Sequence, residues 1–257
     1  MNLKVVAIIQ ARMGSSRLPR KSLRKIAGNP LIDLVFSRVS RATLLDQLVL
    51  ATSTLPEDDI LESWANEKGL LCFRGSSEDV LDRFQGAAEA AGADIVVRIT
   101  ADDPLKDPGI IDFLVAKVLE SPEIQYSSNT ALPSFPEGLD VEVFSIGALN
   151  EANNSAKLMS DREHVTPYIK KTLMKSQTYD LISNIDYSHL RWTVDYEEDL
   201  RFMEKIFGHF SPDIYFPWTD VINLLERDPS ISRINHGVAP RNHGYSLSID
   251  KEKLEQQ

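Results

Sequence analysis

The sequence of 257 residues is poor in cysteine, in basic side chains relative to acidic ones, and in long apolar runs. Its single cysteine, Cys72, allows no disulfide within the chain, which fits a reducing compartment. The net charge of −10 argues against general nucleic-acid binding, because proteins of that class usually present a basic face. No apolar stretch is long enough to cross a bilayer. We therefore expect a cytoplasmic protein with neither a nucleic acid nor a membrane as its partner.

Two common nucleotide-binding patterns are also missing from the sequence. The chain contains neither G-x-x-x-x-G-K-[ST] nor G-x-G-x-x-G. Its five histidines form no zinc-like cluster with the cysteine. A nucleotide site in this chain must therefore use another kind of loop. The hydrophobic fraction of 42% and the charged fraction of 26% are ordinary for a globular protein.

Against this acidic background, one loop is strongly basic. The apolar run 4–10 has the length and the β-branched residues of a buried strand, and the periodic stretch 30–41 predicts a helix. Residues 11–32 contain no acidic side chain, and Gly14, Ser15 and Ser16 favour a sharp turn with outward-pointing amides. Such a loop suits polyphosphate oxygens, whose charge arginine and lysine neutralise. Its basic side chains are Arg12, Arg17, Arg20, Lys21, Arg24 and Lys25.

By composition alone, a basic surface loop is the simpler interpretation of these residues. Their position after the first predicted strand changes that balance. Open α/β sheets bind ligands at the carboxyl ends of their strands, where such a loop begins. We therefore interpret residues 11–21 as a local anion site.

Strand and helix patterns alternate four times in the first 120 residues. This alternation predicts an α/β fold with a doubly wound, mostly parallel sheet and helices on both faces, in three layers. Thr52, Arg74 and Asp102 follow later strands and are expected near the basic loop. The later strands are predicted at 47–52, 70–73 and 94–100, and the later helices at 80–91, at 108–120 and in a segment that ends near Lys68.

The second half of the chain is less regular. Strands are predicted at 124–128 and 139–144, the latter half-exposed because apolar and acidic residues alternate in it. We expect a single domain over residues 1–257, with a hairpin near 125–145 that projects and serves a dimer. Helices are predicted at 148–156, 161–174, 197–207 and 219–227, extended segments at 179–185 and 190–194, and an irregular tail from Ser230.

Two aspartates follow predicted strands and are candidates for binding a divalent cation. Asp102 comes just after 94–100, and Asp195 comes just after 190–194. Carboxylates at such places can hold Mg²⁺, which bridges phosphate oxygens. Either residue also suits a helix cap or a turn, and those roles need no metal. The basic loop strengthens the metal interpretation.

Seven stretches of the sequence form a distinctive combination. They are ARMGSSRLPRK at 11–21, ATST at 51–54, CFRGSSEDVLDR at 72–83, VRITADDPL at 97–105, GLDVEVF at 138–144, REHVTPY at 162–168 and HLRWTVD at 189–195. In combination, these stretches resemble the cytidylyltransferases, the nucleotidyltransferases that activate sugars. The later stretches resemble the branch named for spore coat polysaccharide biosynthesis protein F, which is related to the CMP-sugar-acid synthetases. The resemblance implies a nucleotide-diphospho-sugar transferase fold, similar to the GT-A fold, and a homodimer.

The resemblance also implies a reaction, in which CMP passes from CTP to an acidic sugar or related acceptor and pyrophosphate leaves. Arg12, Lys21 and Asp102 would be catalytic, with Arg17 adding to the charge that stabilises the transition state. Asp102 and Asp195 would hold Mg²⁺. The implied nucleotide-binding residues are Ala11, Arg12, Gly14, Ser15, Arg17, Lys21, Thr52, Arg74, Asp82 and Thr100.

Two positions depart from the pattern that the family usually has. Ala101 stands where the family usually has glycine, and Arg20 stands where it often has glycine. Neither change removes a charged group that the reaction needs. Two alternatives follow, a glycosyltransferase that uses an activated sugar and a non-catalytic nucleotide-binding subunit. Release of pyrophosphate from CTP separates the first alternative from the transferase reaction.

Overall fold

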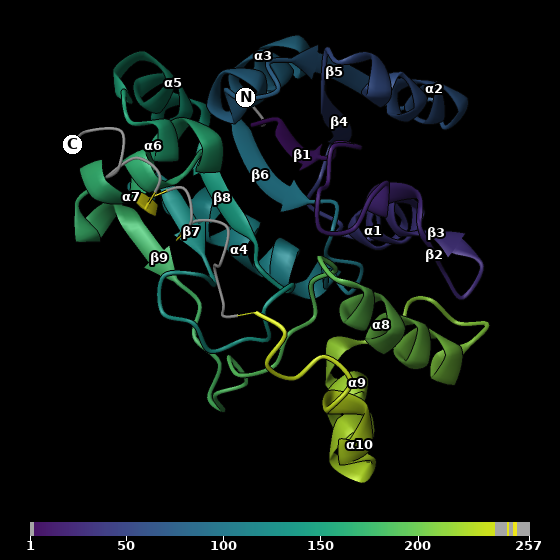
Figure 1. Cartoon of the computed structure of the whole chain (residues 1–257). Helices are drawn as coiled ribbons and strands as arrows, with labels where there is room; N and C mark the ends of the chain where they lie inside the picture. Colours follow the sequence, from purple (N-terminus) through teal and green to yellow (C-terminus); the bar gives the residue numbers. More distant parts are fainter. Residues whose placement is uncertain (1–2, 240–245, 247–248, 251–257) are drawn as a thin grey trace.

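The computed structural model of the chain describes residues 3–239, 246 and 249–250. Among these residues, seven strands form one central sheet, with an order that runs from β5 through β4, β1, β6, β8 and β7 to β9 (Figure 1). β5, β4, β1 and β6 run parallel to one another, whereas β8 runs antiparallel to both β6 and β7. The predicted mostly parallel sheet is therefore confirmed. The strands are β1 (Val5–Gln10), β4 (Gln47–Ser53), β5 (Leu71–Gly75), β6 (Ile95–Thr100), β7 (Tyr126–Ser128), β8 (Glu142–Ser145) and β9 (Thr178–Asp180).

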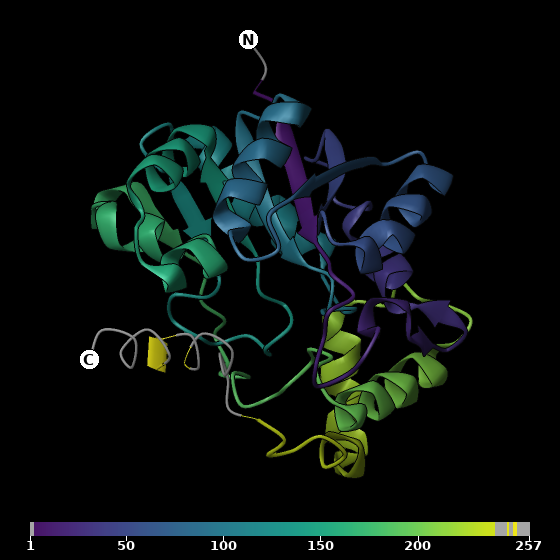
Figure 2. The same cartoon turned by 45° about the horizontal axis from the view of Figure 1, so that its top comes forward.

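Helices cover both faces of the sheet (Figures 1 and 2). The first face carries α1 (Leu31–Val39), α2 (Asp59–Glu67) and α4 (Pro108–Glu120). The same apolar core continues into α8 (Glu197–Phe210) and α9 (Trp218–Arg227), which lie at the lower right of Figure 1. The second face carries α3 (Val80–Ala91), α5 (Ile146–Ser155) and α7 (Pro167–Thr172). In β1, Ala7 and Ile9 pack on the first face and Val6 and Ile8 on the second, which is why this strand reads as one apolar run. The three-layer α/β prediction is confirmed.

The order of the strands reverses beside β1. The chain runs from β1 outward to β4 and β5, then returns through α3 to β6 on the other side of β1. At the carboxyl ends, Gln10 of β1 lies between Ala51 of β4 and Thr100 of β6. A doubly wound sheet opens a ligand crevice at such a reversal. The basic loop leaves β1 at this point.

The boundaries of α3 and α4 match their predictions, whereas other segments differ. A small hairpin, β2 (Lys25–Ile26) with β3 (Asn29–Pro30), interrupts the region that was predicted as loop. The single helix predicted over 161–174 is wrong. α6 (Met159–His164) ends before α7 because Val165 has a φ of 70°, which lies outside the helical region and breaks the helix.

Two further predictions in the second half are corrected. The strand predicted to be half-exposed is buried, with Glu142 4% exposed and Val143 fully buried, because α7 and the ion pairs of Glu142 cover it. Only residues 179–180 of the predicted extended segment 179–185 belong to β9, and the segment 190–194 forms an isolated bridge between Glu137 and Arg191. The tail predicted to be irregular contains α10 (Pro229–Ser232), and most of it beyond residue 239 lies outside the described residues.

The hairpin predicted to project near 125–145 instead supplies β7 and β8 to the central sheet. The connection between the two strands is mostly buried, and Leu132 at its tip is 56% exposed. A role of this segment in a dimer, and the single-domain organisation, stay predictions. In the part of the chain that the structure describes, no helix has the length and apolar character needed to span a membrane.

Candidate active site

The loop after β1 is anchored by buried apolar side chains and backbone hydrogen bonds, and its arginines are exposed. Met13 and Leu18 are 6% and 3% exposed and belong to the apolar core of the first face. The Met13 amide donates to Asp58 Oδ1 at 2.7 Å, and the Ala11 amide donates to the Ala51 carbonyl at 3.2 Å. Apolar anchoring and these backbone bonds fix the path of the loop, so its arginines are presented to solvent and to the crevice.

Lys21 lies at the centre of the site. Its Nζ is 2.7 Å from Asp102 Oδ2 and 2.8 Å from Asp195 Oδ1. Its side chain is only 16% exposed. Burial alone would lower the pKa of Lys21, but the two carboxylates outweigh that effect and raise the pKa to about 12. Lys21 is therefore fully charged at neutral pH and joins two segments that are far apart in the sequence.

Both carboxylate oxygens of Asp195 are held by cationic side chains. Arg17 Nη2 and Lys21 Nζ lie 2.9 Å and 2.8 Å from its Oδ1. Arg191 Nη2 lies 3.3 Å from its Oδ2. Burial would raise the pKa of Asp195, but Lys21 and then Arg17 lower it to about 2. The carboxylate is thus ionised and oriented, as a metal ligand or a phosphate-site partner must be.

A buried network of hydrogen bonds and ion pairs stabilises the segment that carries Asp195. Asp199, which is fully buried, accepts hydrogen bonds from the Asp195 amide at 3.0 Å and from Arg191 Nε at 3.0 Å. Asn235 Nδ2 donates to Asp199 Oδ1 at 3.0 Å, and Arg191 also pairs with Glu137 at 3.0 Å. Prediction from the sequence did not connect these residues with Asp195, although Arg191 and Asp199 stand four residues before and after it.

The adjacent aspartates after β6 have different environments. Asp102 faces Lys21, and its backbone carbonyl accepts a hydrogen bond from the Val194 amide at 2.9 Å, which ties the two acidic segments together. Asp103 points inward, 2.8 Å from the buried Lys106 and 2.7 Å from Thr100 Oγ1. Burial raises the pKa of Asp103 to about 6 despite Lys106. Asp103 therefore supports the loop, and Asp102 is the one available to the site.

The structure brings together four of the predicted site residues, namely Arg17, Lys21, Asp102 and Asp195. Arg12 is exposed and makes no ion pair with any residue that the structure describes. Gly14 is exposed, and Ser15 Oγ accepts from the Leu18 amide at 3.3 Å to stabilise the turn.

Four other predicted nucleotide-binding residues lie apart from this cluster or are engaged elsewhere. Arg74 lies two strands from β1 and pairs at 2.7 Å with carboxylates of both Asp59 and Glu62. Arg74 is in register with Thr52 near the carboxyl ends of β5 and β4, so it lies on the predicted edge of the sheet, but its guanidinium is paired with α2. Thr52 is fully buried, Asp82 is exposed on the first turn of α3, and Thr100 bonds Asp103. Their contacts with a nucleotide stay predictions.

Two buried side chains that prediction missed carry unsatisfied polar atoms. Arg83 is 2% exposed on α3, donates to the Ser76 carbonyl at 2.6 Å, and has an Nε without a partner among the described residues. Gln10 Oε1, at the carboxyl end of β1, is likewise buried and without a partner there. Buried polar atoms are normally hydrogen-bonded, so these two atoms are exceptions among the described residues.

The donor set suits one kind of metal site. Within the described residues, no group of three or more histidine, cysteine or acidic side chains is arranged to hold a metal. Asp102 and Asp195 offer oxygens to one shared position, as their common contact with Lys21 shows. Mg²⁺ typically binds through one or two carboxylates and completes its shell with water and substrate phosphates. The residues therefore fit Mg²⁺ held jointly with a polyphosphate.

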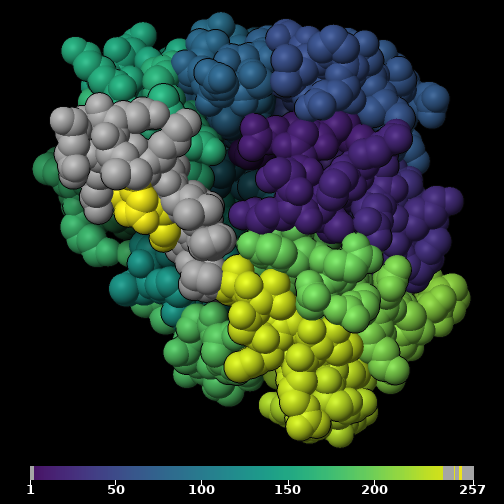
Figure 3. Space-filling view, in the orientation of Figure 1, coloured from purple at the N-terminus to yellow at the C-terminus, as the bar shows by residue number. Residues whose placement is uncertain are grey.

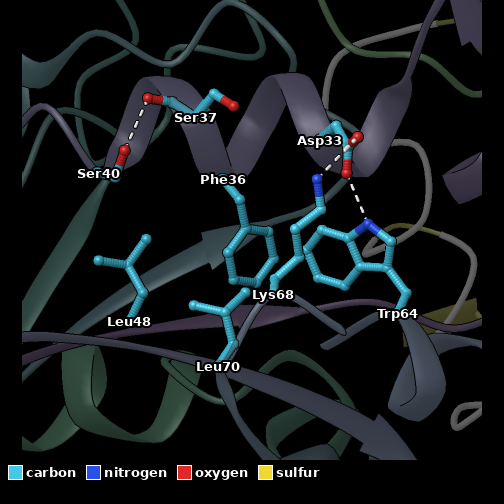
Figure 4. Close-up of a pocket in the computed structure, with 8 residues that line it drawn as sticks. All are labelled: Asp33, Phe36, Ser37, Ser40, Leu48, Trp64, Lys68 and Leu70. Carbon is cyan, nitrogen blue, oxygen red and sulfur yellow. Dashed lines mark hydrogen bonds and ion pairs between the residues drawn. The ribbon is translucent and has the colours of Figure 1, made fainter. Parts of the chain in front are cut away.

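A separate hollow of about 190 Å³ lies between α1 and α2 and contains none of the predicted site residues (Figure 4). Trp64 Nε1 donates to Asp33 Oδ1 at 2.6 Å across it, and the Trp64 ring packs edge-on against Phe36 at 4.9 Å. The N-terminal segment, which carries the basic loop, and the segment near residue 200 meet elsewhere on the surface, where purple and light green adjoin in Figure 3. The residues around the hollow are Asp33, Phe36, Ser37, Ser40, Leu48, Trp64, Lys68 and Leu70.

Comparison with known proteins gives a consistent result. A family model described as cytidylyltransferase matches residues 6–206. Spore coat polysaccharide biosynthesis protein SpsF of Bacillus subtilis is 34% identical over 234 residues, which are 88% of this chain and 95% of that protein. The 3-deoxy-manno-octulosonate cytidylyltransferase of Geobacter sulfurreducens is 33% identical over 124 residues, 48% of each chain. The solved structure of a cytidylyltransferase from Leptospira borgpetersenii superposes with a TM-score of 0.84 at 30% identity, over 90% of this chain and 97% of the other.

Proposed function

The chain belongs to the cytidylyltransferases, nucleotidyltransferases that use CTP, and from that premise we propose that it transfers CMP to an acidic sugar or a related acceptor for a surface polysaccharide. The observation that carries the proposal is the meeting of Lys21 and Arg17 with Asp102 and Asp195 at the carboxyl edge of the sheet. Cations for a polyphosphate then stand beside carboxylates for a divalent metal, which is the arrangement that phosphoryl-type transfer uses.

The cations of the loop would act on the triphosphate. Arg12, Arg17 and Lys21 bind its oxygens and neutralise the charge that builds up when an acceptor oxygen attacks the α-phosphorus and pyrophosphate leaves. The loop is anchored at Met13 and Leu18, so the backbone that carries these side chains is fixed before the substrate binds. Such a reaction needs positioning and charge neutralisation more than covalent help from the protein.

Asp102 and Asp195 would hold Mg²⁺. When bound, the ion would supply positive charge that offsets the negative charge of the phosphates. Arg191 and Asp199 orient Asp195 by the contacts described above. The names of two relatives, one from spore coat polysaccharide biosynthesis and one that acts on 3-deoxy-manno-octulosonate, support an acidic sugar as the class of acceptor.

The two departures from the family pattern do not favour a non-catalytic protein. The Ala101 methyl is 4% exposed and packs in the apolar core of the first face, so it does not protrude into open solvent. Arg20 is exposed and has a φ of 57° and a ψ of 29°. That left-handed conformation explains why glycine suits this position better than arginine, without any role for the arginine in the reaction.

The first experiment is a thermal shift with CTP, UTP, GTP and ATP, each with and without Mg²⁺. A ligand at about 100 times its dissociation constant stabilises the folded state by roughly 2.7 kcal/mol. We expect the largest shift with CTP and Mg²⁺. No shift with any nucleotide would support the non-catalytic alternative.

The second experiment measures pyrophosphate release from CTP with a panel of acidic sugars. We expect release with at least one acceptor, and Asp102→Asn should abolish it because the variant loses a carboxylate from the shared position. Asp220→Asn, an exposed change at the start of α9, is the matched control and should keep full activity. Full activity of Asp102→Asn would refute the role of Asp102. Consumption of a CMP-sugar without any pyrophosphate would instead identify a glycosyltransferase.

A further inference from the structure

Lys21 occupies the position that a divalent cation would need. One ammonium nitrogen lies within 2.8 Å of both Asp102 Oδ2 and Asp195 Oδ1. Mg²⁺ needs carboxylate oxygens at about 2.0–2.1 Å, so the ammonium and the ion cannot use the same two oxygens together. Resting on the proposed function, we propose that Lys21 is an internal cation that keeps divalent metal out of the empty site until the phosphates of the nucleotide draw it away.

The charge balance of the cluster supports this exclusion. Asp195 already contacts three cationic side chains, because Arg17 and Arg191 lie 2.9 Å and 3.3 Å from its oxygens in addition to Lys21. A free divalent ion that approached would meet these charges at short range, where like charges repel strongly in a partly buried site. Its two carboxylate ligands are also already neutralised. Metal without nucleotide therefore has little to gain from this site.

The contacts also identify which partner moves. Asp195 is fixed from behind by Arg191 and through its amide by Asp199, and the Asp102 carbonyl is bonded to the Val194 amide. Lys21, by contrast, reaches the carboxylates through a flexible four-carbon stem. Phosphate oxygens are strong acceptors for an ammonium group. The carboxylates thus stay in place while Lys21 transfers from them to the nucleotide, which leaves their oxygens free for the metal.

This exchange predicts that metal binding depends on Lys21 even in the absence of nucleotide. Because Mg²⁺ also binds CTP in solution, cooperation between CTP and metal in the natural protein does not by itself identify the exchange. Removal of the Lys21 ammonium does identify the exchange, because it leaves the carboxylates of Asp102 and Asp195 free for metal when no nucleotide is present. The test therefore titrates Mn²⁺, a paramagnetic substitute for Mg²⁺, into protein alone, and electron paramagnetic resonance reports the free ion.

We expect Lys21→Met to bind Mn²⁺ about tenfold or more tightly than the natural protein, within the usual range of coupling between two ligands. Lys25→Met, an exposed change four residues further along, is the matched control and should bind as weakly as the natural protein. Combining Lys21→Met with Asp102→Asn should remove the gain. Should Lys21→Met fail to fold by circular dichroism, Lys21→Gln carries the same expectation, because it also lacks the positive charge.

Equal Mn²⁺ affinity in the natural protein and the folded Lys21 variant would overturn the inference. Failure of the proposed function would show differently, as the absence of any CTP thermal shift and of pyrophosphate release in the natural protein. If CTP binds and turns over while Mn²⁺ binds the natural protein as tightly as the variant, only the role of Lys21 as an internal cation is refuted.

Discussion

Glu142 should be among the side chains on which the stability of the sheet depends most. It is 4% exposed in β8 and receives Arg98 Nη1 at 2.5 Å, the Tyr126 hydroxyl at 2.7 Å, Thr166 Oγ1 at 2.7 Å and Lys170 Nζ at 3.0 Å. These donors come from β6, β7 and the α6–α7 region, so one carboxylate joins three parts of the fold. The perturbation that tests this is Glu142→Gln, which keeps the shape and removes the charge.

The expected loss follows from leaving Arg98 and Lys170 without their counter-charge. Breaking a buried ion pair by removing one partner costs about 3–5 kcal/mol. The Lys170 side chain is 36% exposed and can turn to solvent, so we expect the lower end of this range, about 3 kcal/mol. For a chain of this size the melting temperature should fall by roughly 6–12 °C. Urea unfolding at pH 7, followed by tryptophan fluorescence, measures the loss.

The pH dependence gives a second, independent readout. Burial would raise the pKa of Glu142, but Lys170 and Arg98 together hold it well below the ordinary value of 4.5. A depressed pKa contributes stability that is fully present above the pKa of the unfolded chain and is lost as the pH falls through the folded pKa. The difference between the natural protein and Glu142→Gln should therefore shrink by about 1 kcal/mol per pH unit below pH 4.5.

A matched control and a clear contrary result complete the test. Glu163→Gln changes a nearby glutamate whose side chain is 43% exposed, and it should alter the free energy of unfolding by less than about 0.5 kcal/mol. A loss below about 1 kcal/mol for Glu142→Gln at pH 7 would refute the reasoning. So would a difference between Glu142→Gln and the natural protein that does not change between pH 7 and pH 3.5.

Two further predictions concern residues outside this network. Arg20→Gly should raise the free energy of unfolding by about 1 kcal/mol, because the φ of 57° is strained for any residue with a Cβ; Arg20→Ala should bring no such gain in a denaturant titration, and equal effects of the two changes would contradict this account. Burial, with Glu62 adding to it, raises the pKa of the Cys72 thiol to about 11. Alkylation by iodoacetamide at pH 8, followed by mass spectrometry, should therefore be roughly 100-fold slower than that of a free thiol, and an equal rate would show that the thiol is not perturbed.

The sequence predicts the chemistry of the candidate site, but only some of the residues that form it. The basic loop, Asp102 and Asp195 stand out in the sequence because each follows a strand pattern and because acidic residues are missing between 11 and 32. Arg74 follows a strand as well, yet it braces α2 through Asp59 and Glu62. Position at the end of a strand predicts the edge on which a side chain lies, but not the direction in which its functional group points.

What the sequence alone determined is local. β1 is recognisable because burial on both faces requires an uninterrupted apolar run. α3 and α4 have the predicted ends because Asp79 and Asp107 cap them, and Gly92 closes α3 with a φ of 62°. These signals lie within a few residues of the element that they define, and packing does not override them.

What only the tertiary structure decided depends on residues far apart in the chain. Lys21 meets Asp102 and Asp195 across 81 and 174 residues, and no local pattern encodes that contact. The alternation of apolar and acidic residues in β8 predicts exposure, whereas Arg98 on the neighbouring strand neutralises Glu142 and permits its burial. Burial of a charge depends on the partner that the fold brings to it. Only the tertiary structure therefore determines that Glu142 is buried and that Lys21 lies between two aspartates.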